Sequence, residues 1–173
     1  DVVYAIVEAT GSKSGFYRSP DRGETWRRMG DYISSSPQYY QEIVADPHQM
    51  DRVYSLDTYL HVTEDGGKTF TRAGEANKHV DNHAMWIDPA DPDHLIIGCD
   101  GGLYETFDRC KTYRFTANLP ITQFYKIAID RSEPFYNVYG GTQDNATLGG
   151  PSQTDNANGI RNADWFITVF GDG

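Results

Sequence analysis

Short apolar runs alternate with polar turns along the whole chain. Val2–Val7, Val53–Leu56 and Leu95–Gly98 are each four to six residues long, rich in β-branched or aromatic side chains, and followed closely by Glu or Asp. Runs of this length predict strands rather than helices, because a helix that buries one face needs a longer amphipathic stretch. The pattern therefore predicts an all-β fold of antiparallel strands joined by tight turns.

A motif of the form Ser/Thr-x-Asp-x-Gly-x-Thr-aromatic, known as an Asp-box, recurs along the chain. Two copies are complete, and a third at 106–113 carries Cys110 in place of the glycine. The motif positions are Ser19, Asp21, Gly23, Thr25 and Trp26, then Thr63, Asp65, Gly67, Thr69 and Phe70, then Thr106, Asp108, Thr112 and Tyr113. Their aspartates are 44 and 43 residues apart. A fixed period of this length indicates a repeat architecture.

A second signature follows the same period and defines the repeat unit. Asp46, Asp88 and Asp130 end apolar runs and are 42 residues apart both times. Between each such aspartate and the next Asp-box lie two further apolar runs, so each repeat predicts four antiparallel strands, A to D in chain order. Repeats of this kind form the blades of a β-propeller, which has four to eight of them.

The repeats predict one partial β-propeller over 1–173. We expect a partial blade one at 1–30, blade two at 39–73, blade three at 83–116, and blade four at 123–168 with an insertion at 147–163. Residues 169–173 would then start the next blade. The chain would hold about 3.75 blades of a larger propeller, the remainder coming from the same or another chain. A closed ring of four blades is the alternative.

The Asp-box predicts a C–D hairpin turn with a structural role. Its aspartate accepts hydrogen bonds from backbone N–H groups, its glycine adopts a positive φ, and its aromatic residue packs between sheets. Cys110 at the glycine position predicts a changed turn in the third copy. Asp46, Asp88 and Asp130 are interpreted as strand terminators.

Candidate catalytic and binding residues lie at the other end of the blades from the Asp-box turns. The B–C turns and the D-to-A crossovers meet there and form one rim of the propeller. Asp57, Asp100 and Asp144 follow successive B strands, 43 and 44 residues apart. Other polar and aromatic residues expected on this rim are Tyr39, Tyr40, Tyr59, His79, Asp81, His83, Gln143 and Asn145. Carboxylates, amides and tyrosines around a concave mouth suit a sugar, although aspartate is also a common turn former. The spacing His79-x-Asp81-x-His83 leaves a divalent metal site open as an alternative.

Composition and charge limit the classes of ligand that the chain is expected to bind. A net charge of −10 without a basic stripe disfavours nucleic acid and favours neutral or cationic ligands. No apolar run approaches the 18 or so residues of a membrane span. Cys99 and Cys110 are expected at opposite ends of a strand pair, too far apart for a disulfide. No motif in the chain predicts a cofactor.

Three segments carry a resemblance to a known group of proteins. They are Asp81–Pro89, Leu95–Tyr104 and Tyr139–Asn145. Here the chain resembles secreted bacterial Asp-box proteins, labelled "glycosyl hydrolase, BNR repeat" or sortilin-like. The resemblance implies a secreted, periplasmic or cell-surface protein of many blades. A more distant likeness is to two-propeller xyloglucan-hydrolysing glycosidases, and it implies that Asp100 is a catalytic carboxylate whose acid partner comes from a second propeller.

Two functions follow as hypotheses. The first is a carbohydrate-active propeller, either a glycoside hydrolase or a glycan-binding relative, with a sugar stacked on Tyr39, Tyr40 or Tyr59. The second is a non-catalytic, sortilin-like scaffold that captures proteins on a propeller face. A cation-dependent site at His79, Asp81 and His83 is a weaker third.

Overall fold

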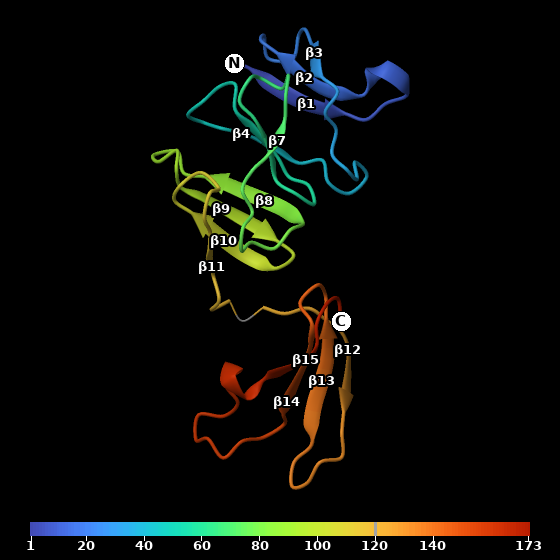
Figure 1. The fold of residues 1–173 in the computed structure, drawn as a ribbon, viewed down its shortest axis with the longest axis vertical. Helices are drawn as coiled ribbons and strands as arrows, with labels where there is room; N and C mark the ends of the chain where they lie inside the picture. The colour runs from blue at the N-terminus through green and yellow to red at the C-terminus, as the bar shows by residue number, and fades with distance from the viewer. Residues whose placement is uncertain (120) are drawn as a thin grey trace. The chain divides into compact units, whose positions relative to one another are not determined.

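The computed structural model describes residues 1–119 and 121–173, which form two compact units, Asp1–Ala117 and Asn118–Gly173 (Figure 1). Within the described residues every regular element is a strand except two 3₁₀ turns, η1 (Gly11–Lys13) and η2 (Asn162–Asp164). The all-β prediction is confirmed. The described part of the chain holds no helix long and apolar enough to cross a membrane.

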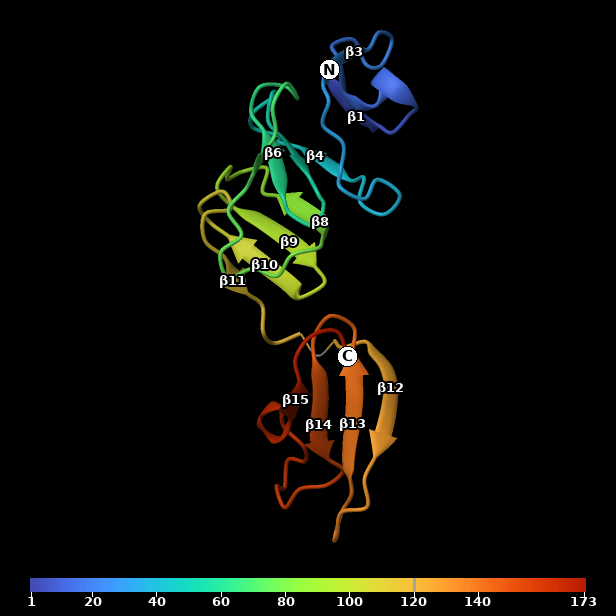
Figure 2. The ribbon, with the colours of Figure 1, turned by 45° about the vertical axis from the view of Figure 1, so that its right-hand side comes forward.

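The first unit contains three antiparallel sheets with strands in chain order, which correspond to blades one to three (Figures 1 and 2). Blade one has three strands, β1 (Val3–Val7), β2 (Gly15–Ser19) and β3 (Arg27–Gly30). Blade two has β4 (Ile43–Ala45), β5 (Val53–Ser55), β6 (His61–Thr63) and β7 (Thr71–Arg72). Blade three has β8 (Asn82–Ile87), β9 (Leu95–Cys99), β10 (Gly102–Thr106) and β11 (Arg114–Phe115).

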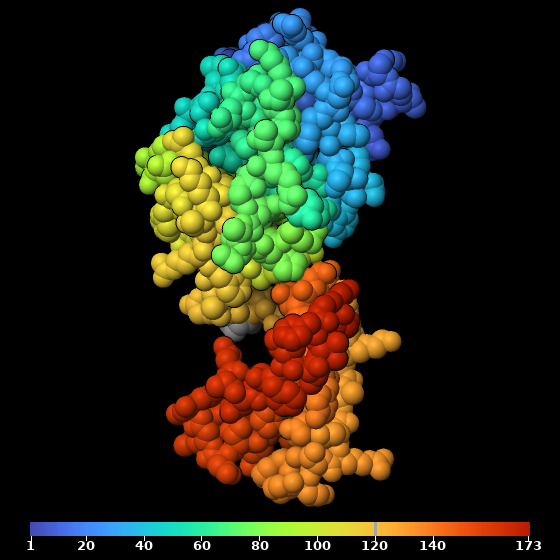
Figure 3. Space-filling view, in the orientation of Figure 1, coloured from blue at the N-terminus to red at the C-terminus, as the bar shows by residue number. Residues whose placement is uncertain are grey.

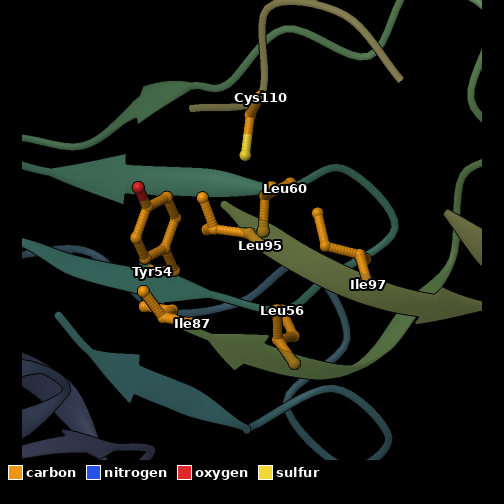
Figure 4. Close-up of a cluster of buried hydrophobic side chains, with 7 residues drawn as sticks. All are labelled: Tyr54, Leu56, Leu60, Ile87, Leu95, Ile97 and Cys110. Carbon is orange, nitrogen blue, oxygen red and sulfur yellow. The ribbon is translucent and has the colours of Figure 1, made fainter. Parts of the chain in front are cut away.

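The core of the first unit lies between blades two and three, as Figure 4 shows. It consists of Tyr54, Leu56, Leu60, Ile87, Leu95, Ile97 and Cys110, all buried. In β9 the alternation of a strand directs Leu95 and Ile97 into this core, where neither has exposed surface. All three residues of β5 are buried. This is the pattern of a strand covered on both faces.

The second unit is one four-stranded antiparallel sheet, with β12 (Phe124–Ile129), β13 (Asn137–Thr142), β14 (Thr147–Pro151) and β15 (Phe166–Val169). The predicted insertion at 147–163 is wrong at its start, because Thr147–Pro151 is the third strand of this blade and pairs with β13. Its glycines suggest a loop, but they leave room for aromatic rings that pack against the strand. A Cβ on Gly150 would lie 2.6 Å from the Trp165 ring, and one on Gly149 would lie 2.8 Å from the Phe166 ring.

Residues 169–173 run back along the β13–β14 turn. Ala146 N donates to Gly171 O at 2.8 Å, and Gly173 N donates to Thr142 O at 3.1 Å. In the first unit the crossover from blade two to blade three makes the same kind of contact, since Asn82 N donates to Asp57 O at 3.0 Å. Residues 169–173 therefore contact the B–C turn of their blade as a crossover does. The start of a further blade there stays a prediction.

The three Asp-box turns make the same hydrogen bonds. In the first, Thr25 N donates to Asp21 Oδ1 at 2.9 Å and Thr25 Oγ1 donates to Oδ2 at 2.6 Å. Thr69 with Asp65 and Thr112 with Asp108 repeat both bonds within 0.1 Å. These bonds lower the pKa of Asp21 and of Asp108 to about 2. The aspartates are thus fully occupied by their own turns.

One expectation about these turns is wrong. Cys110 does not change the third turn, because its φ of 67° stays positive, as do those of Gly23 at 94° and Gly67 at 96°. Its thiol lies in the core, where burial raises its pKa to about 11, so the side chain compensates for the strained backbone. Another expectation, that the aromatic residue packs between sheets, holds for Phe70, which packs on Phe16, and for Tyr113, which packs on the core. It does not hold for Trp26, which is 44% exposed and lies over its own turn, donating from Nε1 to Gly23 O at 3.0 Å.

The aspartates at the A-strand ends also act in turns, each bonded to the residue that precedes or begins strand B. The Asp46 carboxylate lies 3.6 Å from Arg52 Nη1, and Asn137 Nδ2 donates to Asp130 Oδ2 at 2.9 Å. In blade three this partner is His94, whose Nδ1 lies 3.1 Å from Asp88 Oδ2 and whose Nε2 lies 3.0 Å from Glu105 Oε1. These two carboxylates raise the pKa of His94.

Candidate functional site

The B–C turns of blades two and three lie side by side in the first unit and are joined through one crossover residue. Asp81 N donates to Thr58 O in the blade-two turn at 2.8 Å, and Asp100 N in the blade-three turn donates to Asp81 O at 3.2 Å. The crossover itself is seen in Figure 3, where the green part of the chain runs over the surface of the first unit. Two predicted site segments therefore share one rim.

Five predicted site residues meet on this rim, and we call them the rim cluster: Tyr39, Tyr40, Asp81, His83 and Asp100. At its centre His83 Nε2 lies 2.9 Å from Asp100 Oδ1. Both side chains are reachable from solvent, with 37% of His83 and 22% of Asp100 exposed. At this distance an imidazole N–H can donate to the carboxylate, and the remaining lone pairs of the carboxylate can accept from a hydroxyl group.

Two tyrosines flank the imidazole. The Tyr39 ring is 64% exposed and stands nearly perpendicular to the rings of Tyr40 and His83, with centroid distances of 4.9 and 5.5 Å. Tyr40 is buried and tilts against His83 at 5.2 Å. An exposed ring fixed by two neighbours loses little side-chain entropy when a ligand packs on it. Tyr39 is thus an exposed aromatic surface beside His83, the residue that pairs with Asp100.

Tyr40 is bonded to Asp81. Its hydroxyl donates to Asp81 Oδ1 at 2.7 Å, across 41 residues of sequence. Burial, this hydrogen bond and the charges of Asp81 and Asp100 raise the pKa of Tyr40 above its usual value. Tyr40 therefore stays protonated at neutral pH and acts as a hydrogen-bond donor within the cluster.

Asp57 occupies the same place in its repeat as Asp100 but has different surroundings. It is 2% exposed, and its carboxylate accepts from Ser35 N at 2.7 Å, from Ser35 Oγ at 2.5 Å and from Thr58 N at 2.7 Å. All three donors belong to the protein's own loops. These contacts favour a structural role for Asp57 over the predicted contact with a substrate.

Tyr59 and His79 lie near the cluster but make other contacts. The guanidinium carbon of Arg72 lies 3.4 Å from the Tyr59 ring centroid, so one face of that ring is covered. His79 Nδ1 lies 3.0 Å from Val80 O. The side chains of His79, Asp81 and His83 thus bond to three different partners. Among the described residues no three His, Cys, Asp or Glu side chains are grouped to hold a metal ion, so the predicted metal alternative is not supported.

The remaining predicted residues belong to the second unit. Gln143, Asp144 and Asn145 form its β13–β14 turn, the B–C turn of blade four. Asp144 has a φ of 57°, and its backbone N donates to Asp172 Oδ1 at 3.0 Å. Asn145 Nδ2 donates to Gln143 O at 2.9 Å. The turn is ordered by its own contacts and by the chain's last residues.

A buried polar network beneath the rim cluster escaped the sequence reasoning. The Lys78 ammonium has no exposed surface and lies 3.0 Å from Glu75 Oε1 and 2.6 Å from Asn82 Oδ1. Asn82, also fully buried, donates from Nδ2 to Asp57 O at 3.0 Å. In the sequence, a lysine and a glutamate three residues apart are typical of a surface ion pair. No sequence signal therefore shows that Lys78 and Glu75 are buried. Their burial fixes the crossover from below.

Two solved structures are similar to this chain in fold. The GH74 enzyme of Niastella koreensis is 18% identical over 86% of this chain, with a TM-score of 0.50, and the GH74 xyloglucanase of Xanthomonas campestris is 16% identical over 87%, with a TM-score of 0.49. The chain spans about a quarter of the length of these enzymes, 26% and 27%. Neither family models nor curated protein sequences give a match. The likeness to the Niastella koreensis enzyme and the antiparallel sheets of the chain agree with the predicted partial β-propeller fold.

Proposed function

We propose that this chain is part of a carbohydrate-active β-propeller and that the rim cluster contacts the glycan. The observation that carries this proposal is the His83–Asp100 pair, exposed to solvent and placed beside the Tyr39 ring. An aromatic ring next to a carboxylate suits a sugar, because the ring packs on the sugar's C–H face while the carboxylate accepts from its hydroxyls. Export of the protein, which the resemblance implies, belongs to this proposal.

Asp100 is the residue we propose for chemistry, if the complete protein hydrolyses its ligand. Glycoside hydrolysis uses two carboxylates on either side of the scissile bond. Asp57 is enclosed by its own loop donors, and Asp81 is held by Tyr40. Asp100 is therefore proposed as one of the two, with its partner supplied by another part of the protein, as in the two-propeller glycosidases that the sequence resembles.

The proposal is tested by titrating this chain with a xyloglucan-derived oligosaccharide in a calorimeter. We expect measurable binding, which weakens about tenfold in Asp100→Asn and in Tyr39→Ala, because each removes an interaction worth roughly 1.4 kcal/mol. Glu24→Gln is the matched control, since Glu24 is an exposed carboxylate in the first Asp-box turn. It should bind like the wild type.

Two results would contradict the proposal. Unchanged affinity in both rim variants would place the ligand elsewhere on the chain. No binding of xyloglucan, cellulose or mannan oligosaccharides would favour the protein-capturing scaffold instead.

A further inference from the structure

We propose that Asp81 is a positioning residue that holds Asp100 in place for ligand contact and also holds Tyr40, which supports the His83 ring. This inference rests on the proposed function, since positioning matters only where the rim cluster meets a ligand. In the sequence Asp81 is a candidate rim residue and a candidate metal ligand. Its contacts give it a different task.

The backbone of Asp81 links the two B–C turns. Its N–H donates to Thr58 O, and its carbonyl accepts from Asp100 N. To make both bonds the residue adopts a φ of 65°, in the left-handed region that residues with a Cβ usually avoid. Asp and Asn tolerate this region better than other residues that carry a side chain. The position of the Asp100 turn thus depends directly on the conformation of Asp81.

The side chain of Asp81 fixes the second element of the site. Its Oδ1 accepts from the buried Tyr40 hydroxyl at 2.7 Å. Tyr40 in turn packs against the imidazole that pairs with Asp100. One residue therefore holds the carboxylate through its main chain and the ring beside the imidazole through its side chain.

The segment on both sides of Asp81 keeps it in place. Asn82 is fully buried and donates from Nδ2 to Asp57 O at 3.0 Å and to Glu75 Oε1 at 3.1 Å. Lys78 donates from Nζ to His79 O at 2.7 Å. Because the neighbouring residues face inward and are bonded there, Asp81 and His83 are held toward the rim. A preorganised site of this kind contacts its ligand without a cost for ordering the loop.

Three substitutions separate the two parts of this role. Asp81→Asn keeps both an acceptor oxygen and tolerance of a positive φ, Asp81→Gly keeps only the backbone, and Asp81→Ala keeps neither. Each variant is titrated with the xyloglucan-derived oligosaccharide. Exchange of the Tyr40 hydroxyl proton and of the Asp100 amide is followed by NMR, together with the thermal midpoint.

We expect Asp81→Asn to bind the probe within about threefold of the wild type and Asp81→Gly to bind it about tenfold more weakly. In Asp81→Gly the Asp100 amide should stay protected while the Tyr40 hydroxyl proton exchanges faster. Asp81→Ala should lose protection at both places. A purely structural role would instead lower affinity and thermal midpoint together in all three variants.

The outcomes distinguish this inference from the proposed function. If the wild type binds and Asp81→Gly binds equally well, Asp81 does not position the site, although the proposed function survives. If the wild type binds none of the oligosaccharides, the proposed function fails and this inference fails with it. Full protection of the Asp100 amide in Asp81→Ala would overturn the backbone part independently of any ligand.

Discussion

The C–D turns and the B–C turns lie at opposite ends of strand C in each blade, and both recur with the same period. In the C–D turns the Asp-box aspartates make the same bonds in all three copies. In the B–C turns the equivalent aspartates differ, since Asp57 is enclosed by Ser35 and Thr58 whereas Asp100 faces His83 near solvent. Contacts that stay the same in every repeat belong to the fold. A functional site is expected where equivalent residues of the repeats make different contacts.

The largest expected effect concerns packing behind a C–D turn. A Cβ on Gly67 would lie 2.0 Å from Cδ1 of the buried Phe16, whereas one on Gly23 would meet nothing closer than 3.7 Å. Both glycines have a positive φ. We expect Gly67→Ala to lower the free energy of unfolding by about 3 kcal/mol or more and Gly23→Ala by about 1 kcal/mol. Urea unfolding measures both, and equal losses would contradict this account of the turns.

The next effect separates the two B–C aspartates. Asp57→Ala removes a buried carboxylate that accepts three hydrogen bonds, so we expect a loss of about 2–3 kcal/mol in the free energy of unfolding. Asp100→Ala should cost less than about 1 kcal/mol, because its carboxylate has access to water. Urea unfolding of the two variants measures both losses. Similar losses at both positions would remove the distinction between a structural and a site aspartate.

A third effect is the acid response of the C–D turns. The folded pKa values of Asp21 and Asp108 lie near 2, below the usual value of 3.8. A depressed folded pKa contributes stability that is complete above about pH 4 and is lost as the pH falls toward 2. In Asp21→Asn with Asp108→Asn, the thermal midpoint should depend less on pH between 4 and 2 than in the wild type. An unchanged slope would mean that these turns do not stabilise the fold through charge.

The smallest effect lies at an A–B turn. The pKa of His94 is raised by Asp88 and Glu105, so its contribution is fully present below its unfolded pKa of about 6.5 and is lost as the pH rises through the folded value. Blade two has Arg52 at the equivalent place, which stays charged. His94→Arg should therefore make the thermal midpoint depend less on pH between pH 5 and 8. A profile identical to that of the wild type would show that His94 contributes no pH dependence.

The repeat pattern predicted most of the fold, because strand periodicity and turn residues are local properties. The runs at Val53–Leu56 and Leu95–Gly98 contain β5 and most of β9. The strand β14 was missed because its glycines are explained by rings elsewhere in the blade, those of Tyr139, Trp165 and Phe166, which approach only in the folded sheet. The unchanged turn at Cys110 was missed for a similar reason, since its thiol contributes to a core shared by two blades.

The candidate site was predicted in part. The period placed Asp57 and Asp100 at equivalent turns, but it could not tell which carboxylate would be enclosed. That depends on Ser35, in the crossover from blade one to blade two, and on His83, in β8, which contact the turns only after folding. The network of Lys78, Glu75 and Asn82 carries no sequence signal at all, because burial alone distinguishes it from surface polar residues.

The central claim is that a glycan contacts the rim cluster and leaves the C–D turns untouched. The most direct test maps backbone amide and side-chain shifts of the ¹⁵N-labelled chain during titration with a xyloglucan-derived oligosaccharide. The account predicts saturable shifts at Tyr39, His83 and the Asp100 turn, with none at the Asp-box turns around Asp21 and Asp65. Shifts centred on an Asp-box turn, or none on the rim cluster at saturation, would contradict it.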